Sequence, residues 1–138
     1  MINPKAFNLL QGIVGEKKFK EVFEENTQIE LEELPLEENE IYGDFKVKDT
    51  SVYIDVKNYS EEGGARDITE FAIDKLKKIK EHNSDGMLII VNVFAKEKYA
   101  NPNSDYKDIF IISNVIGENN IKDWRNIEKI KNWIDENT

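Results

Sequence analysis

Residues 41–58, IYGDFKVKDTSVYIDVKN, predict a β-hairpin around which the rest of the chain is organised. We place a two-residue turn at Asp49-Thr50, so that Lys48 pairs with Ser51. Because successive side chains of a strand point to opposite faces, this register sorts the hairpin into two faces. The apolar face, expected to meet the core, carries Ile41, Gly43, Phe45, Val47, Val52, Ile54 and Val56. The polar face carries Tyr42, Asp44, Lys46, Lys48, Ser51, Tyr53, Asp55 and Lys57.

The polar face brings two carboxylates together. Asp44 lies directly opposite Asp55 in this register, and Lys57 follows two residues later on the same face. Opposed like charges destabilise paired strands, and hard divalent cations prefer carboxylate oxygens, so we expect a cation here. A metal ion held by two carboxylates beside an ammonium group suits the hydrolysis of a phosphodiester. The alternative is an ordinary solvated strand face with a surface ion pair of little energetic value.

The spacing of these residues resembles the signature of a known superfamily. Asp44, ten intervening residues and then Asp55-Val56-Lys57 resemble the signature of the PD-(D/E)XK nucleases, which include many restriction endonucleases and Holliday-junction resolvases. The chain departs from it at Gly43, where the motif often has proline. The resemblance implies Mg²⁺, or Mn²⁺ in its place, bound by Asp44, Asp55 and the Val56 carbonyl. It also implies that Lys57 orients the attacking water or stabilises the phosphate.

Glu16 is a further candidate for this site. It lies three and seven residues before Phe19 and Phe23, and therefore beside the apolar stripe of a predicted helix. The surrounding segment GIVGEKKF resembles the first helix of several families with the nuclease fold, in which a glutamate points towards the metal. The resemblance implies that Glu16 is an auxiliary metal ligand. Its alternative is a plain surface pair with Lys20 at i, i+4, and helical periodicity does not separate the two.

The remaining chain predicts alternating helices and strands. Apolar spacing predicts a helix to about residue 25, a half-exposed strand over residues 27–34, and buried strands over residues 87–95 and 109–115. A charged connection containing Glu37, Glu38 and Glu40 precedes the hairpin, with Glu40 as a minor candidate ligand. Two further helices are expected to begin at Asp67, as a capping box with Glu70, and at Asp123.

This order gives helix, three strands, helix, two strands and helix. We therefore predict one α/β domain over residues 1–138, with a central mixed sheet flanked by helices. The resemblance implies that its core is restriction-endonuclease-like.

The helix after the hairpin carries a cluster of lysines. Its expected buried stripe consists of Ile68, Ala72, Leu76 and Ile79. The opposite side is expected to carry Lys75, Lys77, Lys78 and Lys80. Because this helix follows the hairpin directly, we expect Lys75, Lys77 and Lys78 to contact a nucleic-acid backbone, with a solvated surface as the alternative. His82, at the helix end, is assigned to the helix dipole.

Composition narrows the classes of function. The chain of 138 residues has no cysteine and one histidine, so it lacks disulfides and thiolate metal sites. No secretory signal and no apolar run of membrane-spanning length is present, which favours a cytoplasmic protein that does not contact a membrane. The net charge of −9 is unusual for a protein that grips phosphates. We therefore expect a partner domain, a second subunit as in a homodimer, or the metal ion to supply part of the attraction.

Together with the hairpin carboxylates, the resemblance implies a Mg²⁺-dependent nuclease, with an endonuclease preferred over other types and DNA preferred over RNA as substrate. Two alternatives stay open. The chain can be a nuclease-fold interaction module or acidic inhibitor without activity, which its acidity would suit. It can also be an antibacterial toxin nuclease that acts on RNA.

Overall fold

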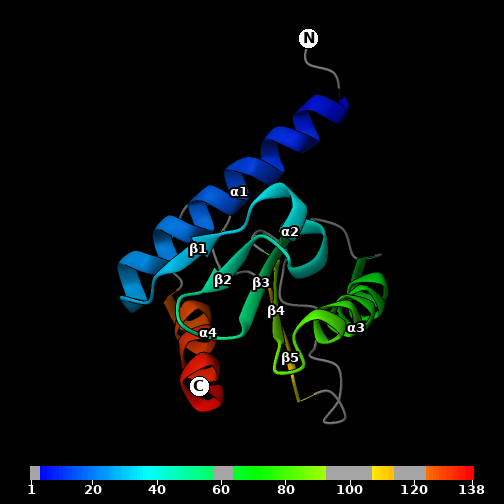
Figure 1. Ribbon diagram of the computed structural model, residues 1–138. Coiled ribbons are helices and arrows are strands. Elements are labelled where there is room, and N and C mark those ends of the chain that lie inside the picture. The colour runs from blue at the N-terminus through cyan, green and yellow to red at the C-terminus, as the bar shows by residue number, and fades with distance from the viewer. Residues whose placement is uncertain (1–3, 58–63, 93–106, 114–123) are drawn as a thin grey trace.

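The computed structural model describes residues 4–57, 64–92, 107–113 and 124–138 (Figure 1). Four helices and five strands form these segments, in an order close to the predicted one. They are α1 (Pro4–Thr27), β1 (Leu31–Glu33), α2 (Leu36–Tyr42), β2 (Phe45–Val47), β3 (Val52–Lys57), α3 (Gly64–His82), β4 (Met87–Asn92), β5 (Ile109–Ser113) and α4 (Trp124–Asn137).

The strands form one mixed sheet in the order β1-β2-β3-β4-β5. The pairs β1-β2 and β2-β3 are antiparallel, whereas β3-β4 and β4-β5 are parallel. The prediction of an α/β fold with a central mixed sheet flanked by helices is therefore confirmed.

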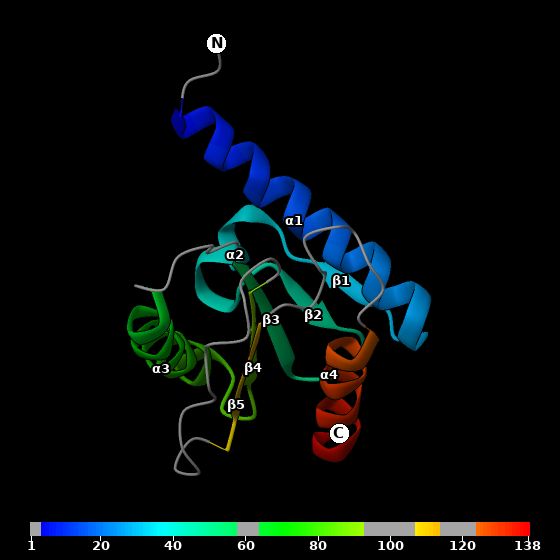
Figure 2. The ribbon, with the colours of Figure 1, turned by 180° about the vertical axis from the view of Figure 1, so that it is seen from behind.

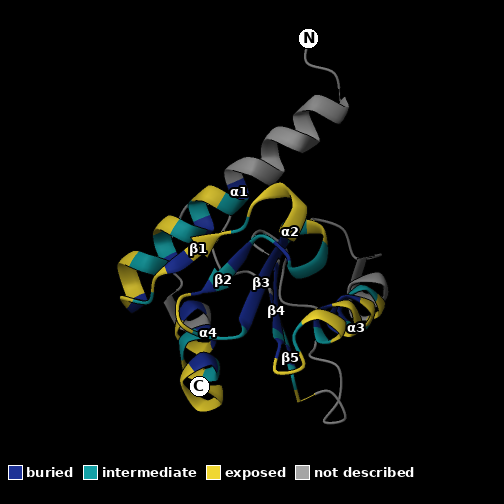
Figure 3. Cartoon of the chain, viewed as in Figure 1, coloured by how far each residue is buried: buried dark blue, intermediate teal, exposed yellow. Residues whose placement is uncertain are grey.

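Helices cover both faces of the sheet, with α1 and α4 on one face and α3 on the other (Figures 1 and 2). Phe19 and Phe23 of α1 and the isoleucines of α4 pack on the first face. Ala72, Leu76 and Ile79 of α3 pack on the second. The central strands are buried on both sides, which Figure 3 shows as a dark core between the helices. The prediction that β4 is a doubly buried strand is confirmed, because residues 88–91 are completely buried.

The hairpin has the predicted register. Phe45 pairs with Ile54, and continuing the register by one residue sets Asp44 across from Asp55. The turn differs, because the Thr50 N–H donates to the Val47 carbonyl at 3.1 Å and four residues separate the strands. Its central residues are Lys48 and Asp49 rather than Asp49 and Thr50. Asp49 has a φ of 62°, a conformation that aspartate tolerates better than most residues.

The surroundings of the hairpin differ from the prediction in two ways. The segment around Glu37 and Glu38 forms helix α2 instead of a loop, and these two glutamates lie in its first turn, where the helix dipole favours acidic residues. Strand β2 consequently begins at Phe45 and not at Ile41. The polar face of the hairpin is not solvent-exposed throughout, because α3 covers it and buries Tyr53 and Asp55.

Several predicted boundaries also move. Strand β1 is shorter than residues 27–34, because Thr27 ends α1 and its hydroxyl donates to the Phe23 carbonyl at 2.7 Å. Helix α3 begins at Gly64, so Asp67 lies inside the helix and is not its N-cap. Residues 93–95 and 114–115 and Asp123, which the predictions included, lie outside the described residues. No helix in the described segments has the length and apolarity needed to cross a membrane.

Candidate active site

Asp44 occupies the junction between α2 and β2. Its Oδ2 atom accepts a hydrogen bond from the backbone N–H of Val56 at 2.7 Å, and its Oδ1 atom accepts one from the Asn39 side-chain amide at 3.0 Å. The first bond reaches across to β3, and the second reaches back into α2. Both carboxylate oxygens are therefore held in place.

Gly43 makes this junction possible. It ends α2 with a φ of 111° and a ψ of −158°, and its N–H donates to the Asn39 carbonyl at 2.9 Å. A Cβ atom here would lie 3.0 Å from the Ile54 carbonyl oxygen and 3.3 Å from the Asp55 Cβ. Proline, with φ locked near −65°, cannot adopt this conformation. Glycine therefore stands here rather than proline for a local reason, since it forms the C-cap of α2, directly before Asp44.

Asp55 is a buried carboxylate between two lysines. The residue is 5% exposed. Its Oδ1 atom lies 3.0 Å from the Lys57 Nζ, and its Oδ2 atom lies 3.8 Å from the Lys75 Nζ. Burial raises the pKa of Asp55 above its ordinary value, and the charge of Asp44 raises it further, whereas the two lysines oppose this shift.

Lys57 stands at the boundary between the buried carboxylate and solvent. Its side chain is 23% exposed, and its Nζ lies 4.2 Å from the centre of the Phe71 ring of α3. A cation over an aromatic face is attracted to it, so Phe71 fixes the direction of the lysine. The ammonium group is thereby placed next to Asp55 while keeping access to solvent.

Glu16 reaches the site from α1. Burial, the charge of Asp44 and a side-chain hydrogen bond with Asp44 raise the pKa of Glu16 to about 7. A hydrogen bond between two carboxyl groups requires a shared proton, which accounts for the direction of the shift. No ion pair between Glu16 and Lys20 is found in the described part of the chain, where Lys20 pairs with Glu24 at 3.4 Å.

The chemistry of this donor set suits a hard divalent cation, since three carboxyl groups interact here. Within the described segments, however, no group of three or more His, Cys, Asp or Glu side chains is arranged to hold a metal ion. Asp44 and Asp55 are thus close enough to Glu16 to raise its pKa, but the three carboxyl groups are not arranged as a metal-ligand cluster. The metal-ligand roles of Asp44, Asp55, Glu16 and the Val56 carbonyl stay predictions.

Lys75 does not lie on the exposed lysine face, and that prediction is wrong. The residue is 8% exposed, and its Nζ donates to the carbonyl oxygens of Asn39 at 3.2 Å and Glu40 at 2.9 Å. Its position explains the burial, because it lies three residues after Ala72 and four before Ile79, on the stripe that packs against the sheet. Burial also lowers the pKa of Lys75. Lys77 and Lys78 are exposed, as predicted.

The minor candidates lie outside this arrangement. The Glu40 side chain is exposed, and its link to the site is the backbone carbonyl, which accepts a hydrogen bond from Lys75. His82 is exposed at the end of α3. Trp133 stacks on Phe110 with ring centres 5.6 Å apart, so its ring packs against β5. Trp124 lies among residues whose side chains are not described.

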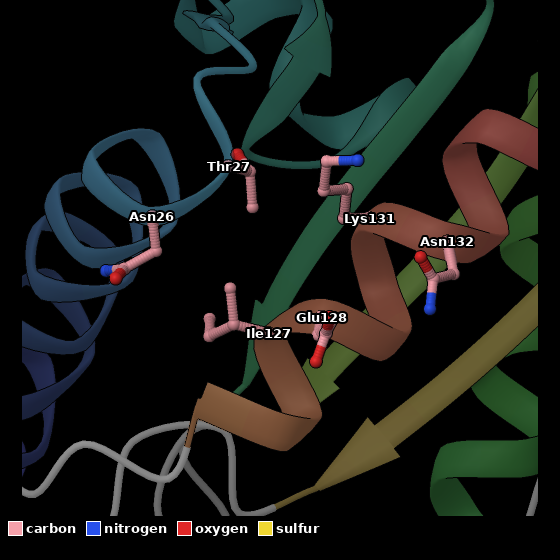
Figure 4. A pocket seen from close by; sticks show the side chains of 6 residues that line it. All are labelled: Asn26, Thr27, Ile127, Glu128, Lys131 and Asn132. Atoms are coloured by element: carbon pink, nitrogen blue, oxygen red, sulfur yellow. The ribbon is translucent and has the colours of Figure 1, made fainter.

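A pocket lies apart from these residues, between the end of α1 and α4 (Figure 4). Its lining consists of Asn26, Thr27, Ile127, Glu128, Lys131 and Asn132. Among these described lining residues Glu128 is the one acidic group, so they offer no counterpart to the carboxylate site.

No protein-family model matches the chain, and no curated protein matches it either. A function is therefore inferred from the geometry of the carboxylates and lysines described above.

Proposed function

We propose that the chain is a Mg²⁺-dependent endonuclease of the PD-(D/E)XK type, with a restriction-endonuclease-like core. The observation that carries this proposal is the convergence of Asp44, Asp55, Lys57 and Glu16 at one end of the hairpin. The sheet supports it as well, because an antiparallel β1-β2-β3 unit is continued by a parallel β4 across a helical connection.

Each residue has a distinct part in the proposed reaction. Asp44 and Asp55 would hold the metal ion, with the Val56 carbonyl and Glu16 as auxiliary ligands. When bound, Mg²⁺ or Mn²⁺ would polarise the phosphate and lower the pKa of a bound water. Lys57 is the cation with access to solvent, so its ammonium group would orient that water or stabilise the negative charge that develops on the phosphate.

Nucleic acid is the proposed substrate, with DNA preferred over RNA. The exposed Lys77 and Lys78 lie on α3, the same helix that places Phe71 against Lys57. Two lysines are few for a protein with a net charge of −9. A partner domain or a homodimer would therefore supply further basic surface.

A second candidate function follows from the acidic surface. Exposed glutamates occur along β1 and α2, directly before Asp44 in the chain, at Glu32, Glu33, Glu37, Glu38 and Glu40. Such a surface repels phosphates and suits a basic protein partner. Under this proposal the chain is an inactive interaction module or an acidic inhibitor with a nuclease fold.

One assay distinguishes these functions. The protein is incubated with supercoiled, linear, branched and single-stranded DNA and with RNA, each with Mg²⁺, Mn²⁺ or EDTA. The proposal predicts cleavage of DNA with either metal and none in EDTA. Cleavage of RNA alone would indicate a toxin-type ribonuclease, and no cleavage under any condition would favour the interaction module. Cleavage in EDTA would contradict metal dependence.

A further inference from the structure

The ammonium group of Lys75 is surrounded by protein acceptors. Its Nζ lies 2.9 Å from the Glu40 carbonyl oxygen, 3.2 Å from the Asn39 carbonyl oxygen and 3.8 Å from Asp55 Oδ2. A lysine has three N–H donors. The two carbonyl oxygens take two of these donors, and Asp55 lies at ion-pair rather than hydrogen-bond distance. Because the residue is also only 8% exposed, Lys75 has little open side to offer a substrate.

Two connections lead from Lys75 to the two candidate metal-binding aspartates. The first is direct, through the ion pair with Asp55. The second passes through α2, because Lys75 binds the Asn39 carbonyl while the Asn39 side chain donates to Asp44 Oδ1 at 3.0 Å. The Asn39 carbonyl also accepts from the Gly43 N–H, whereas the Glu40 carbonyl lies in the last turn of α2, where carbonyls lack partners within the helix. Lys75 therefore also satisfies the end of α2 through Glu40. One side chain thus joins α3, the end of α2 and β3.

Lys57 and Lys75 share neighbours but face different ways. Their Nζ atoms lie 4.2 Å and 5.9 Å from the centre of the same Phe71 ring, and they approach opposite oxygens of Asp55. The Lys57 side chain is 23% exposed, whereas that of Lys75 is 9% exposed. Lys57 is therefore available to a substrate, and Lys75 is directed into the scaffold.

We propose that Lys75 is a positioning residue, which sets the placement of Asp44 relative to Asp55 by holding the end of α2 against β3. This inference rests on the proposed nuclease function, in which both aspartates act together. Loss of Lys75 would leave substrate binding intact and disturb the carboxylates. The expected effect is therefore on metal affinity and kcat rather than on the KM for nucleic acid.

The test compares Lys75→Met with Lys131→Met, which removes an exposed lysine that also pairs with an aspartate, Asp135. The reporter is the backbone amide resonance of Val56, which bonds to Asp44 and does not depend on activity. Lys75→Met should shift this resonance, weaken Mn²⁺ binding and lower kcat, the last two by about 10–100-fold each, as loss of a partner of a metal ligand does. Lys131→Met should change none of these.

A merely structural role for Lys75 would lower the melting temperature alone. A folded Lys75→Met protein with an unshifted Val56 amide would overturn the proposal. If Lys75→Met does not fold, Lys75→Gln, which keeps hydrogen-bond donors, is used instead. A shifted Val56 amide resonance in that variant then supports the proposal, and an unshifted one overturns it. Failure of the nuclease proposal would look different. The parent protein would then cleave no nucleic acid, while the Val56 amide resonance would still shift in Lys75→Met.

Discussion

Asp44 Oδ2 accepts a hydrogen bond from the Val56 N–H across the hairpin, at 2.7 Å. The bond joins Asp44, which directly precedes β2, to Val56, which follows Asp55 in β3. A hydrogen bond to an ionised acceptor is stronger than one between neutral groups, so it offsets part of the repulsion between the two aspartates. The hairpin thus holds together two carboxylates that would otherwise separate.

The conformation of Gly43 predicts a strict requirement for glycine. Gly43→Ala should lower the free energy of unfolding by about 1–3 kcal/mol, because its φ of 111° strains any other residue and its new Cβ meets the Ile54 carbonyl. Gly43→Pro, which restores the common motif residue, should cost more than Gly43→Ala. Chemical denaturation measures both. A Gly43→Pro protein as stable as the parent would contradict the observed end of α2.

The register of this hairpin could be predicted from sequence because alternation leaves few choices. Only one register of the two strands places four apolar residues on the same face, namely Phe45, Val47, Val52 and Ile54. The same register sets Asp44 opposite Asp55. Helix α2 could not be predicted in this way, because its seven residues, LEENEIY, contain too few apolar positions to show a helical stripe and the helix buries none of them.

The raised pKa of Glu16 predicts a pH-dependent stability. A carboxyl group whose pKa is higher in the folded state binds its proton more tightly there, so its contribution is present below the ordinary pKa of 4.5 and lost as the pH rises through about 7. Without divalent cations, the parent should lose stability over this range relative to Glu16→Gln. The exposed Glu25→Gln variant of the same helix is the control. Denaturation curves from pH 4 to 8 that run parallel for parent and Glu16→Gln would refute the shared proton.

Metal binding can be tested without a substrate through Asp44→Asn. Asparagine offers one acceptor oxygen for two donors, so the variant loses one hydrogen bond and is relieved of one negative charge, and its melting temperature in EDTA should change little. Mg²⁺ or Mn²⁺ at 100 times its Kd should stabilise the parent by about 2.7 kcal/mol. The variant should lose most of this response, whereas the exposed Asp74→Asn should keep it. Equal metal-induced shifts in the parent and Asp44→Asn would remove Asp44 from the metal site.

The exposed lysines of α3 predict a salt-dependent contribution to binding. Replacing Lys77 and Lys78 by glutamine should weaken nucleic-acid binding similarly for all sequences. It should also reduce the slope of log K against log salt by about 0.9 for each phosphate that a lysine no longer neutralises. Fluorescence anisotropy across a salt series measures both quantities. An unchanged affinity and slope would place the nucleic acid elsewhere, for example on a partner subunit.

The candidate site could be predicted in part. The alternation of the hairpin is enough to identify Asp44, Asp55 and Lys57 as site residues. Helical spacing places Glu16 beside the stripe that packs against the sheet. The prediction for Lys75 fails because a charged residue is expected in solvent, although its spacing from Ala72 and Ile79 puts it on the buried stripe. Asn39 and Phe71 carry no signal in the sequence, since their partners are distant along the chain and meet them only through the packing of α2 and α3.

The most direct test of the proposed active site is the rate of metal-dependent cleavage by Lys57→Met. Lys46→Met is the matched control, because Lys46 has a similarly exposed side chain and also pairs with a carboxylate, that of Glu32 at 3.4 Å. Single-turnover cleavage of DNA in Mg²⁺ should be about 10²–10³-fold slower for Lys57→Met, the cost of removing one group that stabilises developing charge. Lys46→Met should cleave at the parent rate. A folded Lys57→Met protein that also cleaves at the parent rate would contradict the assignment of this site.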